Sequence, residues 1–185
     1  MTEKPFSSQR VAARGLLRKN PSASISIGDA KVINQDSETI MTRSLYKKDC
    51  LISGKSFALK SLWSRNIFCE PANALYTRSA AEKAGPYSKD FVYVPDWDYG
   101  IELCLQGDLC YIAEPVMSFR ISGNSETSNL YRKKSKIMLQ DTEKMFIKYK
   151  SRLHLSLFRE LMFKLAIRFR MFARLIFIII INIIE

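Results

Sequence analysis

The sequence predicts a mixed α/β fold built from short elements and followed by C-terminal helices. Three observations predict it. Polar and apolar residues alternate at residues 24–27, and strand-like and helix-like segments follow one another over residues 71–119. The third is a basic amphipathic pattern near the C-terminus. The 185 residues are 47% hydrophobic and 25% charged. These values fit one domain with an appendage, and they exclude a polytopic membrane protein, a collagen-like repeat and a wholly disordered chain.

The N-terminal third gives few clear elements. Residues 1–23 are expected to form an irregular lead or a short helix around residues 11–17, because two prolines and a glycine interrupt them. The alternation at residues 24–27 is typical of a half-buried strand, and residues 31–33 extend it before a turn. Residues 39–60 have no pattern that favours one structure.

The middle of the chain is more regular. A strand is expected at residues 72–76, and a short helix at 79–84 begins with Ser79 as its N-cap and ends at Gly85-Pro86. The aromatic and β-branched residues 91–94 are strand-like, and a helix over 98–105 follows them. Two further short strands are expected at 109–113 and 116–119, separated by Glu114-Pro115, and helices are expected within residues 129–160.

The C-terminal segment carries most of the net charge of +11. Projecting residues 161–175 as a helix gathers its basic side chains on one arc, namely Lys164, Arg168, Arg170 and Arg174. The opposite side then holds the apolar side chains Leu161, Met162, Leu165, Phe169 and Phe172. This pattern predicts a helix lying on an anionic membrane surface. The uncharged run at 175–184 is too short to cross a bilayer alone, which takes about 20 residues.

Metal and phosphate motifs are weak. The four cysteines form no C-x-x-C pair and His154 is the single histidine, so we expect reduced thiols, a cytoplasmic setting and no zinc site. Gly54-Lys55-Ser56 resembles the end of a P-loop, but Asp49 stands where the motif requires its first glycine. A basic segment also binds nucleic acid non-specifically, but no recognition module is visible, so nucleic acid is not an expected partner.

Asp96-Trp97-Asp98 is the candidate reactive motif. By spacing alone, its carboxylates could cap the first turn of a helix. A wider order of motifs gives it another interpretation: residues 74–80, Gly85-Pro86-Tyr87, 95–99, Gly107, 111–115 and Phe119-Arg120. Over residues 24–125 this order resembles the acceptor-side half of family 2 glycosyltransferases.

The resemblance implies an incomplete GT-A-like mixed sheet with flanking helices at residues 24–127, followed by a basic helical region at 128–185. It implies that Asp96 is the general base, which removes the proton of an acceptor hydroxyl as that hydroxyl attacks the anomeric carbon. The same resemblance makes Trp97, Asn73, Arg78 and Asp98 substrate-binding candidates. Trp97 could form an apolar floor for a sugar or simply belong to the core, and Asp98 could equally cap the helix.

The sequence departs from the family pattern at several positions. Pro95 replaces the acidic residue before the base, Glu102 replaces an arginine, and Ser122 replaces a histidine. The family's first strand and its metal-binding Asp-x-Asp do not occur before residue 70. Asp96 and Asp98 could themselves be that metal pair, but the helix, glycine and Glu-Pro strand after them match the base motif better.

The function expected from this resemblance is sugar transfer in cell-surface polysaccharide synthesis, by a truncated or split enzyme at the inner face of the membrane. The donor would be a nucleotide sugar, and the acceptor a saccharide or a lipid-linked saccharide. No cofactor is expected in this chain, and Mg²⁺ or Mn²⁺ is expected only with a companion chain that supplies the donor half. The alternative is a catalytically inactive, basic peripheral membrane or scaffold protein.

Overall fold

The computed structural model describes residues 6–64, 66–68, 71–121 and 135–169. The chain divides into two compact units. The first unit comprises Met1–Ser88 and Pro95–Ser125, and the second comprises Lys89–Val94 and Glu126–Glu185. The segment 170–185, which contains Arg170, Phe172 and Arg174 of the expected membrane-surface helix, lies outside the described residues, as does Ser122.

The first unit is mixed α/β, with a curled mixed sheet and flanking helices. Among its described residues, five strands pair in the order β2-β1-β5-β3, with β4 paired to β1. Their bounds are β1 Ala23–Ile33, β2 Thr39–Arg43, β3 Cys50–Ile52, β4 Leu75–Tyr76 and β5 Asp108–Arg120. The β1–β5 pair is parallel, and β2, β4 and β3 add to it antiparallel. The predicted mixed α/β class is therefore confirmed.

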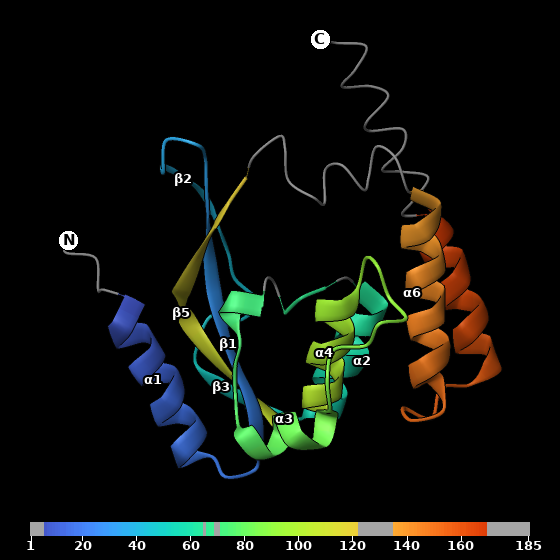
Figure 1. The fold of residues 1–185 in the computed structure, drawn as a ribbon, viewed down its shortest axis with the longest axis horizontal. Helices are drawn as coiled ribbons and strands as arrows, with labels where there is room; N and C mark the ends of the chain where they lie inside the picture. Colours follow the sequence, from blue (N-terminus) through green and yellow to red (C-terminus); the bar gives the residue numbers. More distant parts are fainter. Residues whose placement is uncertain (1–5, 65, 69–70, 122–134, 170–185) are drawn as a thin grey trace. The chain divides into compact units, whose positions relative to one another are not determined.

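Helices cover both sides of this sheet (Figure 1). On one side lies α1, Phe6–Lys19, and on the other lie α2, Gly54–Ser64, and α4, Pro95–Cys104. A 3-10 turn, η1 at Pro71–Asn73, precedes β4, and α3 spans Arg78–Ala84. The unclear residues 39–60 thus supply β2, β3 and most of α2.

Strand β1 forms where the alternation predicts it, but it is not half-buried. The polar Ser24 and Ser26 are only 3% and 1% exposed, because helices cover both faces of the sheet. Ser24 satisfies its hydroxyl by donating to the Leu103 carbonyl of α4 at 2.7 Å. The buried Ser26 hydroxyl has no hydrogen-bond partner among the described residues, so the alternation here does not mark a solvent-facing side.

The expected pair of strands at 109–113 and 116–119 is wrong, because β5 runs through both. Gly28 of β1 pairs with Ile112, and the next residue, Asp29, pairs with Pro115. This irregularity places the proline, which has no N–H to donate, where the ladder is already interrupted.

The two short helices of this unit begin earlier than expected. The side chain of Thr77, not Ser79, caps α3 by accepting the Ala80 N–H at 3.2 Å. The helix ends at Gly85, whose φ of 77° suits glycine. Helix α4 starts at Pro95 rather than residue 98, and proline is favoured at the first helical position.

The second unit contains α6, Ser135–Lys150, and a further helix over residues 157–169. The strand expected at 91–94 does not form. Instead, the N–H groups of Val92 and Tyr93 both donate to the Asp141 carboxylate at 2.7 Å. A side chain on α6 thus takes the bonds that a neighbouring strand would have made. Within the described part of the chain, no helix is both long and apolar enough to cross a bilayer.

Candidate functional site

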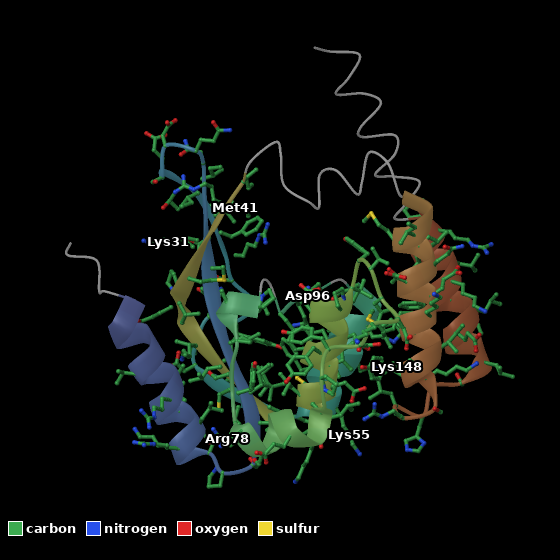
Figure 2. The ribbon with its side chains drawn as sticks, viewed as in Figure 1. Lys31, Met41, Lys55, Arg78, Asp96 and Lys148 are labelled. Atoms are coloured by element: carbon green, nitrogen blue, oxygen red, sulfur yellow. The ribbon has the colours of Figure 1, made fainter. Side chains whose placement is uncertain are left out.

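Asp96 lies in the first turn of α4, and Figure 2 shows it at one end of that helix. Its Oδ1 accepts the backbone N–H of Trp97 at 2.8 Å. Its Oδ2 accepts the Asn66 side-chain amide at 3.1 Å, while the Asn66 Oδ1 accepts the Phe68 N–H. Asn66 therefore ties the carboxylate to the segment that follows α2 and fixes its orientation.

Asp96 is one of the residues that line a small recess. Its walls come from β1, the residues around η1 and β4, the segment after α3, and α4, and they comprise Ile25, Phe68, Pro71, Ala74, Tyr76, Tyr87, Asp96, Tyr99, Gly100 and Leu103. The water-accessible space inside is about 20 Å³, enough for a single water molecule. The recess has room for a group of about the size of one hydroxyl.

Three tyrosines line the same recess as Asp96. The Tyr87 ring stacks on the Tyr99 ring with centroids 4.2 Å apart and an interplanar angle of 20°. Tyr76 meets Tyr99 edge-on at 5.8 Å. Tyr76 and Tyr87 are partly exposed, at 39% and 44%, whereas Tyr99 is buried. Such rings present flat apolar faces with polar tips, which suits the C–H face and the hydroxyls of a sugar.

The surroundings make Asp96 a stronger base than a free aspartate. Burial raises the pKa of its carboxyl, and the hydrogen bonds from the Trp97 N–H and the Asn66 amide offset only part of that rise. Burial also raises the pKa of Tyr87 and of Tyr99, with the neighbouring ring hydroxyls adding to the effect. Both phenols thus stay neutral at physiological pH, and the carboxylate is the group able to accept a proton.

Trp97 and Asp98 follow Asp96 but do not line the recess. Trp97 is 6% exposed, and its indole N–H donates to the Ser61 hydroxyl of α2 at 2.6 Å. This is the core position that the sequence left open as the alternative to a sugar floor. Asp98 is 2% exposed on the same helix. Binding of substrate by either residue stays a prediction.

Asn73 and Arg78 occupy quite different places. Asn73 is buried, and its side-chain amide pairs with both the N–H and the carbonyl of Gly28, at 3.2 and 3.0 Å. It therefore anchors η1 on β1 in the manner of a strand neighbour. Arg78 is exposed at the start of α3, well away from Asp96 in Figure 2. The structure does not bring either residue to the recess.

Some members of the site escaped the sequence analysis. Tyr87, Tyr76 and Tyr99 lie within the motifs Gly85-Pro86-Tyr87, 74–80 and 95–99, but the sequence did not identify any of them as a site residue. Asn66 lies outside every motif, so no sequence signal pointed to it. The four come together only through the fold.

No metal site appears among the residues that the structure describes, because no three His, Cys, Asp or Glu side chains converge there. Cys50, Cys104 and Cys110 are free thiols, and burial raises the pKa of Cys104 far above its ordinary value. No known protein-family model matches the sequence, and a search of curated proteins likewise gives no match.

Proposed function

We propose that the first unit is the acceptor-binding half of a GT-A-like glycosyltransferase of family 2 type, which acts in truncated or split form. The observation that carries this proposal is Asp96, because burial raises the pKa of its carboxyl and the residue lines a recess with room for about one hydroxyl. The mixed sheet with helices on both sides is compatible with such a fold. The partly exposed Tyr87 and Tyr76 would support the acceptor sugar at the rim.

In this proposal, an acceptor hydroxyl enters the recess and donates its hydrogen bond to Asp96. As its oxygen attacks the anomeric carbon of the donor sugar, the new glycosidic C–O bond forms and the proton passes to the carboxylate. The bond to the nucleoside diphosphate breaks, and that diphosphate leaves with the electron pair. Asn66 holds the carboxylate in the orientation that this transfer needs.

The donor sugar and its nucleotide belong, in this proposal, to a companion chain. Mg²⁺ or Mn²⁺ would enter with that chain and neutralise the departing diphosphate. The described residues around Asp96 offer no set of metal ligands, so no step on this chain is assigned to a metal. The acceptor is a saccharide or a lipid-linked saccharide.

Saccharide binding by the chain alone tests the acceptor half directly. We expect a panel of oligosaccharides, added to isotope-labelled protein, to shift the amide resonances of Tyr87, Tyr99 and Gly100. Tyr87→Ala should abolish these shifts. Tyr46→Ala is the matched control, because Tyr46 packs on Tyr111 and is not among the recess residues. Shifts that map elsewhere, or that survive Tyr87→Ala, would contradict the proposal.

Catalysis requires a second experiment. With a companion donor-half chain present, Asp96→Asn should lower the transfer rate by about 100-fold or more, the usual worth of a general base. Asp36→Asn, in the exposed turn between β1 and β2, is the control and should leave the rate unchanged. An unaltered rate in the Asp96 variant, with the fold retained, would remove the base assignment.

One observation favours a second candidate function. Position 95 is the proline that begins α4, so no second carboxylate precedes Asp96. An inactive, basic peripheral membrane or scaffold protein fits that loss. It predicts that no companion chain restores transfer, even where saccharides bind.

A further inference from the structure

The helix over residues 157–169 carries large apolar side chains into solvent. They are between 44% and 83% exposed and comprise Leu157, Phe158, Leu161, Met162, Leu165 and Phe169. Their spacings of three and four residues place them along one side of the helix. We call this set the apolar stripe. A contiguous exposed apolar patch of this kind is typical of a binding surface.

The stripe is not the helix's core face, because that face lies elsewhere and is occupied. Phe163 and Ile167 are 0% and 4% exposed. The Phe163 ring stacks on Phe146 of α6 with centroids 3.9 Å apart. One turn earlier, Glu160 pairs with Lys150 of α6 at 2.8 Å. The two helices thus form an antiparallel hairpin in the second unit, which is visible in Figure 1.

This packing differs from the sequence prediction of a helix with one apolar side and one basic side. Phe163 and Ile167 fall within the arc that the projection assigned to the basic side chains. Lys164 and Arg168 stand at the margin of the stripe instead. Lys164 pairs with Glu160 at 2.9 Å, and Arg168 is 69% exposed at the side chain and 3.9 Å from Glu143. The helix over residues 157–169 therefore packs on α6 with one side, exposes the apolar stripe on another, and carries its cations at the border of the stripe.

The charge of the chain decides what covers the stripe. Residues 161–184 contain four basic and no acidic residues, and the last ten of them are uncharged. A second copy of the chain would bring the same cations against this surface, since each copy carries a net charge of +11. An anionic lipid surface offers both an apolar layer for the stripe and negative headgroups for its margin.

We propose that the second unit docks on anionic lipid through the apolar stripe. Lys164 and Arg168 face the headgroups, and α6 holds the helix from behind through Phe163. The docking surface is a rigid two-helix module rather than a single helix that folds on the membrane. This proposal does not depend on the sugar-transfer function, because it uses only the second unit.

Cosedimentation with vesicles tests the docking. The full chain should pellet with phosphatidylcholine vesicles that contain phosphatidylglycerol, and only weakly with phosphatidylcholine alone. The double variant Leu161→Ser and Leu165→Ser should lower the apparent affinity at least about tenfold, because two leucines no longer enter the apolar layer. The matched control is Val92→Ser with Ile147→Ser, two apolar residues of the same unit that are 60% and 49% exposed outside the stripe. The control should bind as the unaltered chain does.

Two results would overturn the proposal. The first is equal vesicle binding by the stripe variant and the unaltered chain, with the helical circular dichroism signal retained in both. The second comes from sedimentation velocity without lipid: a dimer of the unaltered chain that the stripe variant dissociates, with vesicle binding unaffected, would assign the stripe to a second copy. A loss of vesicle binding leaves saccharide binding by the first unit intact, so the two proposals fail separately.

Discussion

Gly54 gives the sharpest test of the packing between α2 and α4. A Cβ atom added there would lie 1.9 Å from the Gly107 carbonyl oxygen and 2.0 Å from that of Cys104. Real Cβ atoms essentially never come closer than 3.0 Å, so a backbone shift of about 1 Å is required. Neither contact is with a side chain that could rotate away. This close approach also explains why a glycine is needed at position 54 without any role for Gly54-Lys55-Ser56 in phosphate binding.

Gly54→Ala should destabilise the chain by about 3 kcal/mol, at the upper end of overpacking costs. For a chain of this size, that lowers the Tm by roughly 6–12 °C. Gly15→Ala is the matched control: nothing lies within 4 Å of its added Cβ, and alanine in a helix should stabilise by up to about 1 kcal/mol. Thermal and urea unfolding measure both variants. A Gly54→Ala stability within about 0.5 kcal/mol of the unaltered chain would refute the reasoning.

Three further substitutions test the local structure. Thr77→Ala removes the α3 cap and should cost about 1 kcal/mol in urea unfolding. Asp141→Ala leaves the N–H groups of residues 92 and 93 without their acceptor, so it should cost about 2 kcal/mol or more and speed hydrogen exchange at both amides. Asp96→Asn should stabilise the fold at pH 7. Burial raises the pKa of Asp96 in the folded state. The contribution of Asp96 to the free energy of unfolding is therefore fully present at pH below the unfolded-state pKa of about 3.9, and it is lost as the pH rises through the folded-state pKa. The gain from asparagine should therefore vanish in acid, and a gain that does not change with pH would contradict this cause.

The elements that the sequence predicted are those whose signals are local. The alternation of β1, the glycine after α3 and the presence of α3 and α4 each depend on a few consecutive residues, although Thr77 rather than Ser79 caps α3 and α4 begins at Pro95 rather than residue 98. Asp96 was placed at a helix start by the same local logic. The recess that it lines with Tyr87 and Tyr99 is formed by segments far apart in the chain, so the spacing of residues could not predict it.

The failures have physical causes of the same kind. Residues 91–94 have strand composition, but the Asp141 carboxylate accepts the N–H groups of Val92 and Tyr93, which are therefore not available to a neighbouring strand. For Trp97, which the sequence left open between a sugar floor and the core, the structure shows the core position with a hydrogen bond to Ser61, because successive helical residues face directions about 100° apart. The buried Ser24 shows that polar alternation does not guarantee a solvent-facing side. In each case a tertiary partner overrides the local preference.

Gly100 links the size of the recess to the orientation of Asp96. A Cβ added there would lie 2.8 Å from the Phe68 ring. That ring is 4% exposed and packs edge-on against Phe57 at 5.3 Å, so it has little room to move. The Phe68 N–H binds Asn66, and Asn66 in turn holds the Asp96 carboxylate. A methyl group added at position 100 should therefore displace the Phe68 ring, and this displacement should shift Asn66 and, through it, the Asp96 carboxylate.

Gly100→Ala should cost about 1–3 kcal/mol by overpacking. It should also weaken saccharide binding and alter the pKa of Asp96, measured by the pH dependence of its carboxyl carbon resonance. Gly15→Ala again serves as the control, since it adds the same methyl group in open space. If Gly100→Ala lowered stability but left the Asp96 titration and saccharide binding unchanged, Phe68 and Asn66 would not act as the link. The recess would then owe its shape to packing alone, with no coupling to the carboxylate.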